Sequence, residues 1–207
     1  MKQLKSAAKR SGTPGKRQAA VSGAPGEVRI ISGQWRGRKL TVLDAEGLRP
    51  TTDRVKETLF NWLMHDIDGA AVLDCFAGSG SLAFEALSRH AISATLIERE
   101  AAQARQLQHN ISKLNCNNAS VIQQDSLSYL NTAASARFDV VFIDPPFRKD
   151  LALPCCQLLE QYNWLADNAL IYLETEKELP IAQLPANWRL LKEKVAGQLA
   201  YRLYQRG

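Results

Sequence analysis

Residues 70–83 read AAVLDCFAGSGSLA: a short apolar run, an aspartate and a glycine-containing turn that leads into more apolar residues. An apolar strand that ends at a tight turn and continues into a helix is typical of the first unit of an open α/β sheet. Four later apolar runs also lack alternation; they cover 94–98, 119–125, 138–144 and 169–174. Because continuous apolar strands are buried on both faces, the sequence predicts a doubly wound, Rossmann-like α/β fold with helices on both sides of a parallel sheet.

The segments that flank this core predict different structure. Residues 28–32 and 39–43 are two short β-rich runs around a glycine-containing turn, and apolar spacing over 55–63 predicts a helix with one buried face. Near the other end, 188–195 and 199–204 predict an antiparallel hairpin at the sheet edge.

Charge is distributed unevenly along the chain. Its 207 residues include 26 basic and 21 acidic ones, and the first 26 residues hold six of the basic ones and no acid. This segment is poor in large apolar side chains, so we expect a disordered tail, which is either merely solvated or an electrostatic arm for nucleic acid. The expected parts are a basic tail over 1–26, a hairpin-and-helix extension over 27–69 and an α/β domain over 70–207.

Composition excludes several classes of protein. The chain is 45% hydrophobic and 23% charged, which is typical of a soluble globular protein. No apolar run approaches the roughly 18–20 residues of a membrane span, and no signal peptide is recognisable, so we expect a cytoplasmic protein without a membrane partner. The four cysteines and three histidines lack metal-ligand spacing, which predicts reduced structural thiols and no metal.

Carboxylates stand at the ends of four predicted strands: Asp74, Glu98, Asp125 and Asp144. Each one alone is better explained as a cap of the following helix. Four together on separate strands favour a ligand site, because open α/β sheets bind ligands at the carboxyl ends of their strands. Such a site would repel a phosphate-rich ligand and suit one with hydroxyls, amines and positive charge.

The first of these loops contains a G-x-G-x-x-A pattern, a weak match to the dinucleotide-binding fingerprint. Asp74 disfavours NAD, because the pyrophosphate would lie close to its charge. S-adenosylmethionine has no phosphate and carries an ammonium and a sulfonium, and Gly78 and Gly80 would let the backbone approach it closely. We predict that Glu98 accepts hydrogen bonds from the ribose hydroxyls and Asp125 from the adenine amine.

Asp144-Pro145-Pro146-Phe147 follows directly on an apolar strand. The prolines contribute no N–H, so Asp144 and the Pro145 carbonyl offer acceptors without competing donors. Two acceptors on the hydrogens of an exocyclic amine favour the pyramidal geometry in which the nitrogen lone pair can attack a methyl group. Phe147 offers a flat face to a base taken out of its stack. A strand-terminating turn with a core phenylalanine is the alternative, and the four acids together favour the catalytic interpretation of all four residues.

These motifs resemble the class I S-adenosylmethionine-dependent methyltransferases that carry an (Asp/Asn)-Pro-Pro-aromatic motif. Three more segments, RIISGQWRGRKL (29–40), RPTTDRVKETLFNWL (49–63) and GQLAYRLY (197–204), are similar to the RsmD family, and the similarity covers about 29–206. It implies a seven-stranded methyltransferase sheet with an antiparallel edge, and N2-methylation of one guanine in bacterial small-subunit ribosomal RNA. The cofactor-binding residues that we predict are Asp74, Ala77, Gly78, Gly80, Glu98, Asp125, Ser126 and Thr51.

Trp35, Arg36, Arg38 and Lys39 lie in the turn between the two N-terminal runs. The tryptophan can stack on a base while the cations meet phosphates, so we predict that these four residues bind RNA. An exposed turn with solvated charges explains the same residues equally well. The resemblance favours a partly assembled small ribosomal subunit as the substrate, and the sequence identifies no oligomeric partner.

Other functions share some of these features. DNA adenine and protein glutamine methyltransferases carry this type of Pro-Pro motif, although the missing target-recognition domain argues against DNA and the basic tail against a protein substrate. An NAD-dependent oxidoreductase would need a proton donor, and His65, His90 and His109 fall in predicted helices. A non-catalytic RNA-binding module is disfavoured by the four acids, which would repel phosphates.

Overall fold

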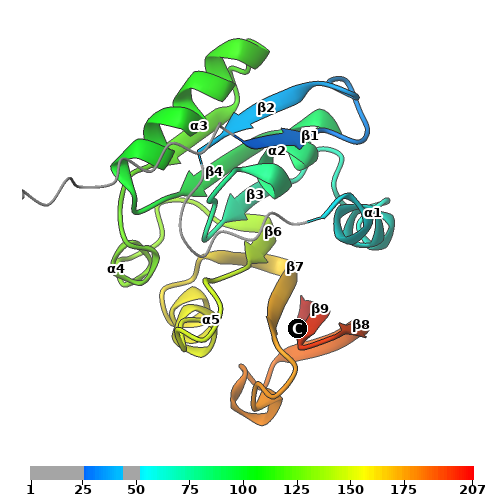
Figure 1. Cartoon of the computed structure of the whole chain (residues 1–207). Coiled ribbons are helices and arrows are strands. Elements are labelled where there is room, and N and C mark those ends of the chain that lie inside the picture. The colour runs from blue at the N-terminus through cyan, green and yellow to red at the C-terminus, as the bar shows by residue number, and fades with distance from the viewer. Residues whose placement is uncertain (1–25, 44–51) are drawn as a thin grey trace, which may run out of the picture.

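The computed structural model describes residues 26–43 and 52–207 (Figure 1). Thr51 and all of the predicted tail except Gly26 lie outside the described residues. The centre is a seven-stranded sheet in the order β5-β4-β3-β6-β7-β9-β8. Its strands are β3 (Ala71–Asp74), β4 (Ser93–Ile97), β5 (Ala119–Ile122), β6 (Phe138–Ile143), β7 (Leu165–Glu176), β8 (Trp188–Ala196) and β9 (Leu199–Arg206).

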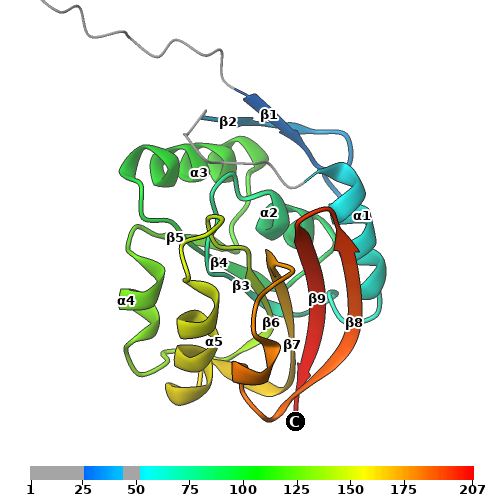
Figure 2. The same cartoon turned by 60° about the horizontal axis from the view of Figure 1, so that its bottom comes forward.

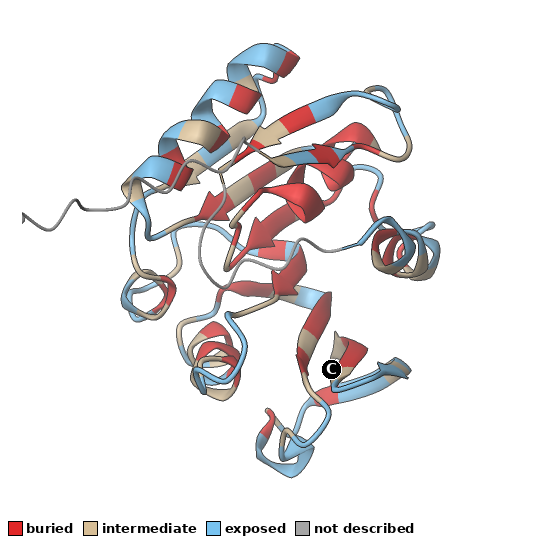
Figure 3. Ribbon diagram, in the orientation of Figure 1, coloured by how far each residue is buried: buried red, intermediate tan, exposed pale blue. Residues whose placement is uncertain are grey.

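Helices cover both faces of this sheet, as Figure 1 shows. The helices are α1 (Asp53–Trp62), α2 (Ser81–Ser88), α3 (Ala101–Leu114), α4 (Ser126–Leu130) and α5 (Ala152–Gln161), with a short 3-10 turn η1 (Ile181–Gln183). Alternate strand residues enter two apolar clusters: Val140 and Phe142 pack with α1, α2 and α3, whereas Val141 and Ile143 pack with α4 and α5. Figure 3 shows the strands buried between helices whose outer faces are exposed. The predicted doubly wound α/β fold is confirmed.

The strand order reverses between β3 and β6. Strands β3 to β7 are parallel to one another, and Asp74 of β3 pairs with Phe142 of β6. The predicted C-terminal hairpin is also confirmed, since β9 runs antiparallel to β7 and β8 antiparallel to β9 at the edge of the sheet (Figure 2). The loops after β3 and β6 therefore meet at the switch point where open α/β sheets bind ligands.

A second, two-stranded sheet, β1 (Gly26–Arg29) with β2 (Lys39–Val42), lies over α2 and α3 (Figure 2). The first of these strands was predicted over 28–32. Its predicted end is wrong, because β1 ends at Arg29. The chain leaves the strand after Arg29, because the amides of Ile31 and Ser32 donate to the buried carboxylate of Glu85 on α2 rather than to a neighbouring strand.

Within the described ranges, no helix combines the length and the apolar character that crossing a membrane requires. The four cysteines, all described, are free thiols, and all are buried. Three of them, Cys75, Cys155 and Cys156, belong to the apolar cluster under α4 and α5, where they fill space as small hydrophobic side chains.

Candidate active site

Asp74 is the last residue of β3, and its residue surface is only 2% exposed. Burial raises the pKa of its carboxyl from 3.8 to about 7, the backbone amides of Phe76 and Ala83 hold the pKa down, and the charge of Glu98 raises it further. A buried carboxyl of this kind is stabilised in its ionised form by any cation placed beside it. The loop after β3 therefore begins with a group suited to a positively charged ligand.

Two glycines shape that loop. Gly78 and Gly80 have φ of +50° and +73°, a region that side chains disfavour. A Cβ on Gly80 would lie 2.6 Å from the ring of Phe84 and 2.7 Å from Leu107. Gly80 is therefore required by the close packing of α2 against α3.

Glu98 directly follows β4 and is half-buried. Its two oxygens accept the backbone amides of Gly78, at 2.9 Å, and Glu100, at 2.7 Å. Burial raises the pKa of this carboxyl, and the two amides oppose that effect. Glu98 thus holds the glycine loop after β3 against the end of β4, so the predicted ribose-binding and glycine residues lie together.

Asp125 and Ser126 have structural partners at the same edge. Asp125 lies three residues beyond β5 and caps α4 by accepting from the amide and hydroxyl of Ser128, at 2.9 and 3.0 Å. The buried hydroxyl of Ser126 donates to the carbonyl of Cys75, which ties the start of α4 to the loop after β3. One carboxylate oxygen of Asp125, Oδ1, is therefore engaged in capping the helix.

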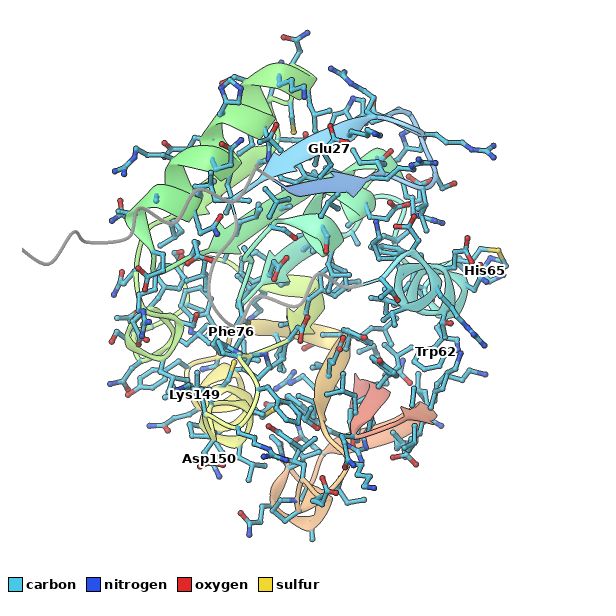
Figure 4. The ribbon with its side chains drawn as sticks, in the orientation of Figure 1. Glu27, Trp62, His65, Phe76, Lys149 and Asp150 are labelled. Carbon is cyan, nitrogen blue, oxygen red and sulfur yellow. The ribbon has the colours of Figure 1, made fainter. Side chains whose placement is uncertain are left out.

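Asp144-Pro145-Pro146-Phe147 forms the turn that follows β6. Asp144 and Pro145 are half-buried, whereas Pro146 and Phe147 are exposed. The guanidinium of Arg148 lies 5.1 Å from the centre of the Phe147 ring, and the Arg148 amide donates to the carboxylate of Glu176 on β7. The turn therefore has a hydrogen bond to the neighbouring strand, and Figure 4 shows Lys149 and Asp150 further along the same loop.

A fifth acid, which was not predicted as a site residue, stands at this edge. Glu174 of β7 stands one position beyond the paired residues Ile143 and Leu173, so it is next in register to Asp144. The hydroxyl of the buried Tyr172 donates to Glu174 at 2.9 Å. The sequence carried the signal, because the apolar run 169–174 ends in this glutamate as the other four runs end in their acids.

The predicted RNA-binding residues lie on the loop between β1 and β2 and at the start of β2. Trp35 is half-buried and packs against the apolar cluster of α1, α2 and α3. Arg38 donates to the carbonyl of Lys113 at 2.7 Å, and Lys39 pairs with Glu27 at 2.7 Å. Arg36, Arg38 and Lys39 are nevertheless exposed.

The three histidines are all exposed. All three were predicted to lie in helices, and for two of them this prediction is wrong. His65 and His90 follow α1 and α2, and only His109 lies inside a helix, α3. Figure 4 shows His65 at the outer side of α1. Elsewhere, a hollow of about 370 Å³ at the amino ends of the strands is lined by Asp66, Asp68, Asp139 and Asp167 among others. It lies at the edge opposite to the one where such sheets bind ligands.

Comparison with known proteins places the chain among methyltransferase relatives. A family described as Conserved hypothetical protein 95 matches residues 28–205. Ribosomal RNA small subunit methyltransferase D of Escherichia coli is 56% identical over 181 residues, which are 87% of this chain and 91% of that protein. The Haemophilus influenzae protein of the same name is 57% identical over 185 residues, 88% of this chain and 95% of that protein.

The solved structures agree with these sequence relatives. The Escherichia coli protein yhhF superposes with a TM-score of 0.82 at 54% identity, over 87% of this chain and 98% of that one. Since the fold and nearly the whole described length are shared at more than half identity, the chain belongs to the RsmD family, described as Conserved hypothetical protein 95.

Proposed function

We propose that this protein transfers a methyl group from S-adenosylmethionine to the N2 amine of one guanine in small-subunit ribosomal RNA. One observation carries the proposal. The glycine loop, which follows Asp74 and is held by Glu98, meets the acceptor turn at Asp144 at the switch point of the sheet. The names of the relatives support ribosomal RNA as the substrate. Ribosomal RNA is cytoplasmic in bacteria, so we place the protein in the cytoplasm.

The residues at the carboxyl edge fit this cofactor. Asp74 supplies a buried carboxyl that gains from a nearby cation, and Glu98 supplies a half-buried carboxylate for ribose hydroxyls. When bound, S-adenosylmethionine supplies a methyl group on a sulfonium, and no metal is needed. The described residues assigned to hold the cofactor are Asp74, Ala77, Gly78, Gly80, Glu98, Asp125 and Ser126; Thr51, assigned on sequence alone, lies outside the described residues.

The turn after β6 would orient the reacting amine. Asp144 and the Pro145 carbonyl accept its two hydrogens, so the nitrogen lone pair is released from the ring and directed at the methyl group. Phe147, which is 44% exposed, is available to stack against the extruded base. No dedicated base is required, because a methylated, positively charged amine is a strong acid and loses its proton after the transfer.

The loop between β1 and β2 would contact the RNA outside the target base. Arg36, Arg38 and Lys39 are exposed and suit phosphates, and the accessible part of Trp35 suits a sugar or base. We expect the substrate to be a partly assembled small subunit, in which the target guanine is still accessible.

The test uses small subunits from cells that lack this protein, incubated with purified enzyme and labelled S-adenosylmethionine. We expect N2-methylguanosine at one position, found by mass spectrometry of nucleosides and mapped fragments, and no label on duplex DNA or on protein. Asp144→Ala should lower the single-turnover rate by roughly 30- to 1000-fold, about 2–4 kcal/mol in the transition state, with cofactor affinity changed only a few-fold. Label on a different nucleoside would refute the proposal, and near-normal turnover of the variant would refute the role of Asp144.

A further inference from the structure

We propose that Glu174 is a specificity-determining residue that selects guanine by accepting a hydrogen bond from its N1–H. This inference rests on the proposed function, since it concerns the base presented to Asp144. It adds a residue outside the Asp-Pro-Pro-Phe turn, on the neighbouring strand β7.

The register of the sheet brings Glu174 beside the acceptor turn. Ile143 of β6 pairs with Leu173 of β7, so Asp144, the first residue after β6, and Glu174 each stand one position beyond that pair. Ile143 and Leu173 both enter the cluster under α4 and α5. Because side chains alternate along a strand, Glu174 points to the opposite face, the one that carries Tyr172.

Tyr172 fixes the orientation of the Glu174 carboxylate. Its hydroxyl donates to Oε2 of Glu174 at 2.9 Å, and its ring is fully buried, edge-on to Phe142 at 6.3 Å between centroids. Burial raises the pKa of this hydroxyl, and the negative charges of Glu174 and Asp144 raise it further. Glu174 itself is partly exposed at the rim, so a base in the site can reach it.

The chemistry of this juxtaposition matches guanine. The Watson–Crick edge of guanine presents two adjacent donors, N1–H and the N2 amine, whereas adenine presents an unprotonated N1 that a carboxylate would repel. Asp144 and the Pro145 carbonyl take the amine in the proposed reaction, and the adjacent carboxylate of Glu174 takes N1–H. Enzymes that act on extruded bases read them through hydrogen bonds to this edge. A polar site built for such a donor discriminates strongly against a base that lacks it.

The test compares two RNA substrates that both keep the 2-amine. Small-subunit RNA is made by ligation with either guanosine or 2-aminopurine at the nucleotide mapped by mass spectrometry. Each RNA is reconstituted into small subunits, and kcat/KM is measured for both. 2-Aminopurine has an unprotonated N1, but it also lacks O6. Because the loss of O6 affects all enzyme variants alike, the preference for guanine is compared between variants. We expect Glu174→Gln to lower the preference for guanine at least ten-fold, since its amide can donate to the unprotonated N1. Tyr172→Phe should lower the preference less, and Glu178→Gln, an exposed glutamate beyond β7, should leave it unchanged.

An equal loss on both substrates, with the preference unchanged, would give Glu174 a merely structural role and overturn the proposal. Should Glu174→Gln fail to fold, Tyr172→Phe carries the same test, since loss of its hydroxyl must still weaken the preference. Failure of the proposed function has a different signature: the wild-type enzyme would not methylate the guanine substrate at all, which would overturn both proposals.

Discussion

The fold imposes an electrostatic cost on Asp74, because burial disfavours the charged form of its carboxyl. Its carboxyl keeps a proton up to about pH 7 in the folded protein, because burial disfavours the charge, whereas an unfolded aspartate loses its proton near pH 4. Between these values the folded state holds more protons than the unfolded state. The contribution of Asp74 to stability is therefore fully present below about pH 4 and is lost as the pH rises through 7.

Asp74→Asn should remove this dependence on pH. We expect the difference in free energy of unfolding, variant minus wild type, to grow by up to about 1.4 kcal/mol per pH unit between pH 4 and 7 and then to level off. Urea unfolding at a series of pH values measures it, and a carbon-13 titration of the Asp74 carboxyl gives the pKa directly. Wild-type and variant curves that stay parallel through this range would show that Asp74 titrates normally.

Glu98 is expected to act on binding rather than on the methyl transfer. Glu98→Ala removes a carboxylate that would accept two ribose hydroxyls, and hydrogen bonds to a charged group contribute roughly 1.5–3 kcal/mol each. Isothermal titration should show weaker binding of S-adenosylmethionine, and saturating cofactor should restore most of the rate. Glu100→Ala is the matched control, because its exposed side chain pairs only with Arg99 among the ion pairs described. A rate that excess cofactor does not restore would assign Glu98 another role.

Single residues were predictable where one local pattern identified them. Asp74, Glu98 and Asp144 follow apolar runs, and each lies at the carboxyl edge as the sequence indicated. Glu85 was not predictable, because its partners Ile31 and Ser32 lie more than 50 positions away. A glutamate in an otherwise apolar helix indicates that a polar partner exists, but it does not identify the residues that supply this partner.

At the scale of elements, buried polar side chains attach the β1–β2 hairpin to three helices. Glu85 of α2 accepts from Ile31 and Ser32, Lys56 of α1 donates to the carbonyl of Arg29 at 2.5 Å, and Asn110 of α3 donates to that of Thr41 at 3.0 Å. All three side chains are fully buried. Backbone groups of a short hairpin are thus satisfied by helices, which fixes its loop on the molecule.

The close fit of Gly33 completes this attachment. A Cβ at Gly33 would lie 1.8 Å from the carbonyl oxygen of Ser88, and its φ is +75°. The amide of Gln34 donates to that same carbonyl at 2.8 Å, and the Ser88 hydroxyl accepts from the amide of Trp35 at 3.0 Å. The loop that carries the proposed RNA-binding cations is therefore set directly on the end of α2.

Glu85→Ala should be strongly destabilising. It leaves the amides of Ile31 and Ser32 without their acceptor and removes the partner of Arg89, whose Nε lies 2.9 Å from Glu85. Breaking a buried pair of this kind costs about 3–5 kcal/mol in free energy of unfolding. Urea unfolding measures the loss, and faster hydrogen exchange at Ile31 and Ser32 locates it. Glu178→Ala, at an exposed ion pair, serves as the control.

If Glu85→Ala and Glu178→Ala unfold at the same urea concentration, the attachment does not stabilise the protein.

The strands of the central sheet were predictable because their apolar runs are continuous, and the observed bounds differ from the predicted ones by a few residues. Pairing with a neighbouring strand sets where a strand begins and ends. For example, β7 begins at Leu165 rather than at the predicted residue 169, because Leu165 pairs with Phe138 of β6.

At the scale of the molecule, one edge of the sheet gathers five carboxylates that the sequence spreads over a hundred positions, from Asp74 to Glu174. The topology predicted from alternating strands and helices accounts for this convergence. Positive charge is distributed differently. Residues 27–207 contain twenty basic and twenty-one acidic residues, so the excess of positive charge belongs to the first 26 residues. That tail, with its predicted disorder, lies outside the described residues apart from Gly26, the first residue of β1.

Deletion of residues 1–25, which leaves β1 complete, should weaken RNA binding while the fold and the rate of methyl transfer stay intact. The deleted segment holds six cations and no acid, and its composition lacks the apolar residues needed to pack on the core. Each cation that meets a phosphate contributes about 0.7–0.9 to the log–log slope of affinity against salt, and we expect the slope to flatten by about 2–3, since only some cations bind at once. RNA binding by both proteins across a salt series measures the slope, and thermal melting checks the fold. An unchanged slope would assign the RNA surface to Arg36, Arg38 and Lys39, and a large fall in Tm would contradict the predicted disorder of the tail.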